Sequence, residues 1–176
     1  MRRIGLLFTI ALTLCGCQNK NSERMTQEIE DFMIIGIAIE TSNLNGQAEQ
    51  DLGALWGRFF SKGISALVPH KSTEDIYSLF TDYESDYRGN YTAILGHKVS
   101  TLDSIPEGLV GRLFTGGTYT TFKAKGEMPQ AIVNTWKEIW SQDEQLQRRY
   151  TVDFEVYGAK SQQGKQSEVD IFIAVP

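Results

Sequence analysis

The residue types best suited to chemistry lie near the C-terminus, where Glu155 is followed two residues later by Tyr157. Residues 150–157 alternate apolar and polar side chains, a period that predicts a strand. Glu155 and Tyr157 would share one face of that strand with Asp153. A carboxylate beside a phenol can pair with a cation, or can serve as general base and acid in hydrolysis. The alternative is a plain solvent-exposed face, and the strand alone leaves these possibilities open.

Other candidates for metal binding or nucleophilic chemistry are weaker. Residues 82–86 (DYESD) space their acids like the start of a calcium loop, but Tyr87 replaces the expected glycine and no glutamate follows at the twelfth position. His70 and His97 have no second plausible ligand near them in the sequence. The sequence therefore predicts no metal site and no cofactor, and residues 82–86 are interpreted as the rim of a hairpin.

Two amphipathic helices would carry most of the aromatic side chains. Trp56 and Trp136 lie 80 residues apart, as do Phe60 and Trp140, which indicates an internal duplication. Phe60 and Trp140 are interpreted as core residues, whereas Trp56 and Trp136 could belong to the core or to a binding site. The two helical stripes are Leu52, Leu55, Trp56, Phe59 and Phe60, and Ile132, Val133, Trp136, Ile139 and Trp140.

Strands are predicted on both sides of each helix. Each half of the chain has the order strand, helix, strand, strand, with an extra strand near the middle, and the halves span about residues 31–100 and 107–176. Duplicated halves meet along a pseudo-two-fold seam, which is a natural place for a cleft. The predicted strands cover residues 32–40, 75–83, 90–99, 109–115, 118–124, 150–157 and 168–175.

The N-terminus has the architecture of an export signal. Arg2 and Arg3 precede an apolar stretch at residues 4–14, which is too short to span a bilayer comfortably. The following Cys15-Gly16-Cys17 completes a sequence that resembles a bacterial lipobox. Residues 1–16 are therefore predicted to be a lipoprotein signal peptide, with Cys17 lipidated by acyl chains that anchor the chain to a membrane. The alternatives are an ordinary secretory signal and an apolar cytoplasmic N-terminus.

The predicted mature protein would have a lipidated tether at residues 17–30 and a domain at residues 31–176, in the cell envelope. Gln18 after the lipidated cysteine favours the outer membrane, facing the periplasm, if the host has two membranes. Loss of Arg2 and Arg3 makes the net charge of −5 more negative, and no run of lysine and arginine exceeds two residues. Duplex nucleic acid is therefore a poor predicted partner.

Short motifs between residues 32 and 176 occur in a recognisable order, namely Gly36, Leu55, Trp56, Ile76, Tyr77, Asp82, Tyr83, Glu84, Tyr91, Leu95, Gly96, Ile105, Pro106, Gly117, Thr118, Tyr119, Trp136, Ile139, Trp140, Phe154, Glu155, Val156 and Tyr157. Together they resemble the gyrase-inhibitor-like small-molecule-binding domain, also called the effector-binding domain of AraC-type and multidrug-responsive regulators. The resemblance implies an α+β fold. Duplicated strand-helix-strand-strand modules would form a curved antiparallel sheet with two helices and an apolar cleft between the halves.

Several members of that family bind bulky hydrophobic, often cationic compounds. By the resemblance, Glu155 and Tyr157 form the carboxylate-aromatic motif of the pocket, and Phe172 faces the cleft together with Asp170. Aromatic faces would stack on a flat cation paired with the Glu155 carboxylate. The predicted ligand-binding residues are Glu155, Tyr157, Tyr91, Trp56, Trp136 and Phe172.

Three functions are compatible with these features. The favoured one is a membrane-anchored protein that binds a hydrophobic small molecule, either neutral or cationic, in an aromatic, acidic pocket. The second is a hydrolase that uses Glu155 and a pocket tyrosine. The third is an envelope interaction scaffold without a ligand. Binding is favoured over catalysis. The sequence also contains no nucleophile elbow or zinc signature.

Overall fold

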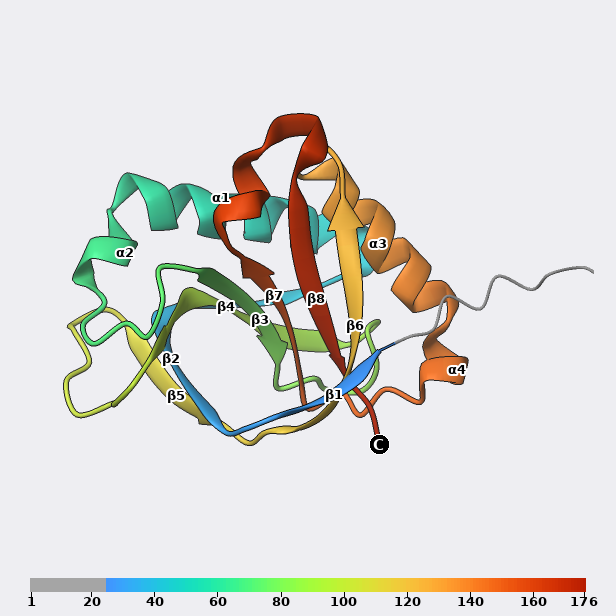
Figure 1. Ribbon diagram of the computed structural model, residues 1–176, viewed down its shortest axis with the longest axis horizontal. Coiled ribbons are helices and arrows are strands. Elements are labelled where there is room, and N and C mark those ends of the chain that lie inside the picture. The colour runs from blue at the N-terminus through green and yellow to red at the C-terminus, as the bar shows by residue number, and fades with distance from the viewer. Residues whose placement is uncertain (1–24) are drawn as a thin grey trace, which may run out of the picture.

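Eight strands pair antiparallel into one sheet, in a computed structural model that describes residues 25–176. The strands are β1 (Thr26–Ile29), β2 (Phe32–Ser42), β3 (Ile76–Thr81), β4 (Asn90–Val99), β5 (Val110–Phe114), β6 (Gly117–Lys125), β7 (Val152–Tyr157) and β8 (Glu168–Ala174). Their order across the sheet is β1-β6-β8-β7-β3-β4-β2-β5. The sheet curls into a half-barrel (Figure 1), which confirms the predicted curved antiparallel sheet and α+β class.

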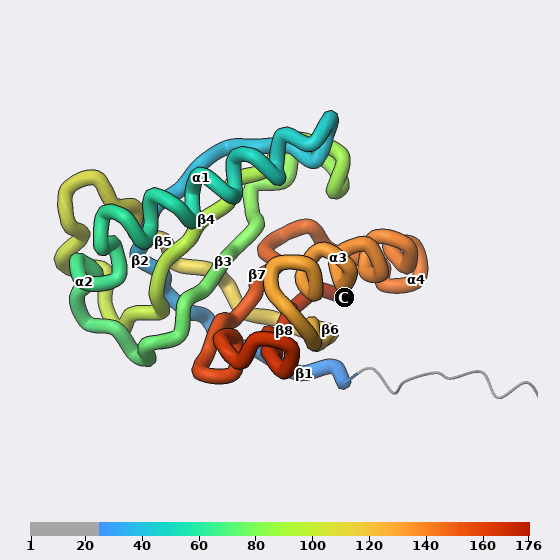
Figure 2. The backbone as a smooth tube through the Cα atoms, turned by 90° about the horizontal axis from the view of Figure 1, so that it is seen from above, coloured from blue at the N-terminus to red at the C-terminus, as the bar shows by residue number. Residues whose placement is uncertain are grey.

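The helices lie on one face of this sheet. Both views place α1 over the strands of the first half and α3 over those of the second (Figures 1 and 2). Each long helix is followed by a helix of one turn. The helices are α1 (Gln47–Ser61), α2 (Ile64–Leu67), α3 (Gln130–Ser141) and α4 (Asp143–Leu146), with short 3-10 turns at Leu44–Gly46, Ala159–Gln162 and Gly164–Gln166.

The duplication is more complete than the sequence pattern suggests. Each half contains two strands, a long helix, a short helix and two further strands. The first strand of each half pairs with the other half: β1 joins β6, and β5 joins β2. The extra strand predicted near the middle is therefore β5, and its counterpart β1 lies inside the segment expected to be a tether. The halves meet where β3 pairs with β7.

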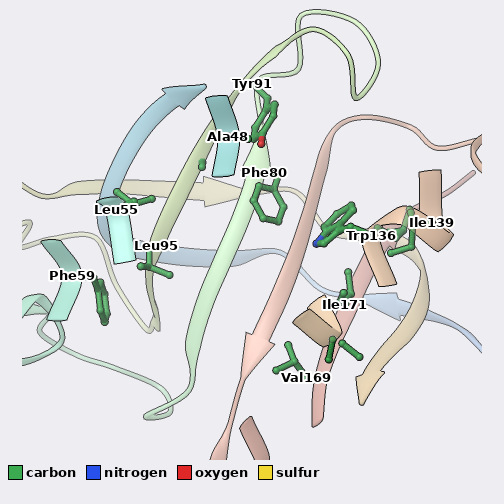
Figure 3. Packing of buried hydrophobic residues seen from close by; sticks show 14 of the residues in the cluster. Ala48, Leu55, Phe59, Phe80, Tyr91, Leu95, Trp136, Ile139, Val169 and Ile171 are labelled. Atoms are coloured by element: carbon green, nitrogen blue, oxygen red, sulfur yellow. The ribbon is translucent and has the colours of Figure 1, made fainter. Parts of the chain in front are cut away.

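Alternation along the strands produces a core on each face of the sheet. On the helix face, Phe59 of α1 and Ile139 of α3 are buried against strand residues such as Leu95 and Ile171 (Figure 3). The opposite face, enclosed by the curl of the sheet, holds a second apolar cluster. That cluster contains Phe32, Ile34, Leu79, Ile94, Phe114, Tyr119, Val152, Phe154 and Ala174, with Phe172 packed against it. The strands β2, β3, β4, β6, β7 and β8 therefore contribute side chains to both cores, whereas β1 and β5 contribute only to the second cluster.

The predicted signal peptide and the lipidated Cys17 lie outside the described residues. Within residues 25–176, none of the helices combines the length and the apolar character needed to cross a membrane.

Candidate functional site

A cavity of about 610 Å³ separates the two long helices above the seam between β3 and β7. Its walls come from α1 and α3, which lie over different halves of the sheet in Figure 2. Apolar and aromatic side chains supply most of its lining, as is typical of small-molecule sites. The lining residues that carry the argument are Trp56, Tyr91, Trp136, Trp140, Glu155 and Tyr157.

Glu155 is buried at the floor of this cavity, with only 3% of its surface exposed. The indole Nε1 of Trp136 donates to its Oε1 at 2.6 Å, and the Tyr157 hydroxyl donates to its Oε2 at 2.8 Å. The Ser78 hydroxyl of the neighbouring strand donates a further hydrogen bond. Burial raises the pKa of the Glu155 carboxyl above its ordinary value, although these three hydrogen bonds oppose the shift.

Several aromatic rings in the walls of the cavity pack against one another edge to face and leave the cavity open. The Trp56 and Tyr157 rings pack edge to face with centroids 4.9 Å apart, and the Trp136 and Phe80 rings do so at 5.2 Å. Figure 3 shows Tyr91 and Phe80 on the first half, with Trp136 of the second half facing them across the seam. These rings present faces and edges to the cavity, where faces attract cations and apolar groups.

A ring stack joins the two halves at the edge of the cavity. Tyr87, from the loop between β3 and β4, stacks on Trp140 of α3 with ring centroids 5.5 Å apart and planes 10° from parallel. The Asn43 amide holds this loop, because its Nδ2 donates to the Tyr87 carbonyl at 2.7 Å. The Tyr91 hydroxyl donates to Asn43 Oδ1 at 3.0 Å. Tyr91 is thus both a cavity residue and part of a structural hydrogen-bond chain.

A buried arginine lies beside the carboxylate site. Arg148 donates to Asp153 Oδ2 at 2.6 Å and to Asp143 Oδ1 at 3.5 Å, and its guanidinium lies 4.4 Å from the centroid of the Tyr150 ring. The Tyr83 hydroxyl donates to the same Asp153 oxygen at 2.9 Å. Two carboxylates therefore neutralise the one buried guanidinium, so Arg148 is not an ion-pair partner of Glu155.

The structure brings five of the six predicted ligand-binding residues together around the cavity: Glu155, Tyr157, Tyr91, Trp56 and Trp136. The placement of Phe172 in the cleft is wrong. Phe172 pairs with Phe154 across β7 and β8, and the two rings stack at 4.6 Å on the opposite face of the sheet. Because partners in a register share a face, the residue of β8 beside Glu155 is Ile171.

The expectation that both Phe60 and Trp140 are core residues holds only in part. Trp140 packs against the core and also lines the cavity, whereas Phe60 is 63% exposed. Nothing in the sequence indicated Arg148, because this residue precedes β7 in an irregular segment without periodicity. Ser78 was missed because a strand serine carries no signal until its partner across the sheet is known.

Comparison with known proteins identifies this fold and cavity as an effector-binding domain, a fold that binds small molecules. The chain belongs to the family of integron-associated effector binding proteins (Cass2), whose model matches residues 27–175. Among solved structures, the integron cassette protein of Vibrio cholerae is 30% identical with a TM-score of 0.68, and the match covers 86% of this chain and 95% of that one.

Two further relatives extend this picture. SAV2435, solved bound to tetraphenylphosphonium, has a TM-score of 0.75 at 20% identity, and the match covers 88% of this chain and 94% of that one. The protein YobU of Bacillus subtilis (strain 168), a candidate transcriptional regulator, is 29% identical over 143 residues, which are 80% of this chain and 89% of YobU.

Proposed function

We propose that this protein binds a hydrophobic organic cation in the cavity between α1 and α3, with Glu155 as the charge partner. The observation that carries the proposal is a buried carboxylate facing an aromatic cavity of about 610 Å³. No lysine or arginine within residues 25–176 forms an ion pair with Glu155. A bound cation would supply the missing countercharge, which matters because an isolated buried carboxylate is costly.

The aromatic walls support the same ligand class. A cation over the face of Trp56 or Trp136 would gain about 0.5–2 kcal/mol per good contact. The structural neighbour SAV2435 was solved bound to tetraphenylphosphonium, which supports this ligand class and makes the compound a suitable first probe. Because burial raises the pKa of Glu155, affinity for the cation should increase as pH rises through that pKa.

Isothermal titration with tetraphenylphosphonium tests the proposal directly. The Glu155→Gln variant keeps the shape and removes the charge, and we expect it to weaken binding by about 2 kcal/mol or more. Glu49→Gln is the matched control, since Glu49 also lines the cavity but is exposed and should matter little. Triphenylphosphine oxide, an uncharged analogue, should bind both proteins weakly and equally. Equal binding of the cation to wild type and Glu155→Gln would refute the role of Glu155.

The hydrogen bond between Glu155 and Tyr157 keeps hydrolysis as a second candidate. A carboxylate with an adjacent phenol could act as base and acid on a bound ester or strained ring. The two functions separate in the Glu155→Gln variant. A binding protein loses affinity, whereas a hydrolase loses turnover of a reactive ester while still binding the uncleaved analogue. A variant that changes neither property would favour the scaffold function.

We further propose that Cys17 is lipidated and anchors this cavity to a membrane. The support is the basic pair Arg2-Arg3, the apolar residues 4–14 and the lipobox-like ending. Fractionation of cells that express the full chain tests it. The wild type should sediment with membranes, and Cys17→Ser should be released or remain unprocessed. Identical fractionation of both proteins, with no difference in mass, would remove the anchor from the proposal.

A further inference from the structure

Gly53 leaves one position of the α1 wall of the cavity without a side chain. It lines the cavity, and a Cβ atom built on it would meet no atom within 4 Å. Glycine inside a helix is less favourable than alanine, and no close backbone approach requires one at this position. Its neighbours along the same side of α1, Glu49 and Trp56, both carry side chains that line the cavity. Bare backbone is therefore exposed to the cavity between two occupied positions.

The opposite wall has a side chain at the equivalent position. The offset of 80 residues that relates Trp56 to Trp136 relates Gly53 to Val133 of α3. Val133 lines the cavity and is 41% exposed. The two pseudo-equivalent walls thus differ in width at this level, and the additional space lies on the side of α1.

We propose that Gly53 is a specificity-determining residue that reserves space along α1 for a second broad apolar group of the ligand. The inference rests on the proposed binding of cations at Glu155. A cation with several rings would place one ring near Glu155 between Trp56 and Trp136 and another against the helix backbone at Gly53. A small cation with a single ring would use only the floor of the cavity and would not reach Gly53.

Substitution by leucine tests this proposal, with Gly57 as a matched control. Gly57 is also inside α1 and has no atom within 4 Å of a built Cβ, but it does not line the cavity. The probes are tetraphenylphosphonium, which carries four rings, and benzyltrimethylammonium, which carries one. Gly53→Leu should weaken binding of tetraphenylphosphonium about tenfold or more, because the cavity becomes overpacked. It should leave binding of benzyltrimethylammonium within about twofold, as should Gly57→Leu for both probes.

The outcomes separate this inference from the proposed function. If neither probe binds the wild type, the proposed function fails and the inference fails with it. If tetraphenylphosphonium binds and depends on Glu155 but Gly53→Leu leaves its affinity unchanged, only the inference is overturned. Equal losses for both probes would also overturn it, since they would indicate general distortion of α1. Thermal unfolding of both leucine variants checks that each protein is folded during the titrations.

Discussion

The two halves of the molecule share a scaffold but contribute differently to the cavity. Trp56 and Trp136 occupy equivalent helix positions, yet Trp56 packs against Tyr157 whereas Trp136 donates to Glu155. The charged groups beside the floor, Glu155 and the Arg148–Asp153 pair, all come from the second half. From the first half, β3 contributes the uncharged residues Ser78 and Phe80 to the floor of the cavity. Duplication thus placed one long helix on each side of the cavity, and divergence of the second half placed the buried carboxylate on that side.

The largest expected difference between the halves is in the free energy of unfolding that depends on the buried ion pair between Arg148 and Asp153. Asp153→Asn should lower the free energy of unfolding by about 3–5 kcal/mol, because it leaves the Arg148 guanidinium buried without its main partner. Asp153 pairs across the seam with Phe80 of the first half. Phe80→Leu should cost less than about 1.5 kcal/mol, since it keeps an apolar side chain of similar volume. Urea unfolding of both variants measures the difference.

An equal loss of unfolding free energy in Asp153→Asn and Phe80→Leu would contradict the predicted difference between the halves. They would mean that Asp143 and the surrounding tyrosine rings compensate Arg148 without Asp153. Loss of folding in Asp153→Asn is consistent with the prediction, and a Glu variant at the same position should then restore part of the stability by returning the charge.

The first half depends on a close approach of two strands that has no counterpart in the second. Gly36 of β2 pairs with Gly96 of β4, and a Cβ on Gly36 would lie 2.2 Å from the Leu95 carbonyl oxygen. Gly36→Ala should therefore destabilise the protein by about 1–3 kcal/mol. The paired positions of β6 and β8 contain no glycine. Thermal unfolding of Gly36→Ala beside Gly57→Ala, which meets no atom, provides the test. A neutral Gly36→Ala would show that the β2–β4 pair can separate freely.

The smallest expected effect is a difference in pH dependence. Burial lowers the pKa of His97 in the first half, so the folded state holds it neutral. The unfolded state binds the proton more readily, and stability should therefore fall as pH drops below about 6.5, by at most about 1.4 kcal/mol per pH unit. Glu155 in the second half has the opposite sign. Its raised pKa means that the folded state holds the proton longer, so its contribution falls as pH rises above the ordinary carboxyl range.

Urea unfolding between pH 7.5 and 5 isolates the His97 contribution, in steps of about half a pH unit. His97→Asn should flatten the decline in stability below about pH 6.5, because it removes the group that must be buried neutral. His70→Asn is the control, since His70 is exposed. If both variants keep the wild-type profile, protonation of His97 does not limit acid stability, and the carboxylates determine it.

Sequence patterns predicted the elements that carry strong periodicity. The strand at residues 90–99 and both amphipathic helices appear where the apolar spacing places them, because local alternation reports which side of an element is buried. The position of β1 was not predictable, since Thr26–Ile29 is polar and is ordered only by its pairing with β6. Phe172 was misplaced for a related reason. Both faces of β8 pack against apolar groups, and only the register with β7 decides which side meets the cavity.

The sequence by itself predicted the helices, the strands and the duplication, because periodicity is a local property of the chain. The resemblance to a known family, and not periodicity, indicated the fold class and singled out Glu155 and its aromatic neighbours. The tertiary structure alone decided that Trp136 and Ser78 hydrogen-bond Glu155, that Arg148 is neutralised beside it, and that Gly53 leaves one wall open. Ser78 and Trp136 reach Glu155 only when β3 pairs with β7 and α3 packs over the sheet. Arg148 is close in sequence to Asp143 and Asp153, but no periodicity indicates that these side chains meet. The open wall at Gly53 exists because the two helices face each other across the cavity.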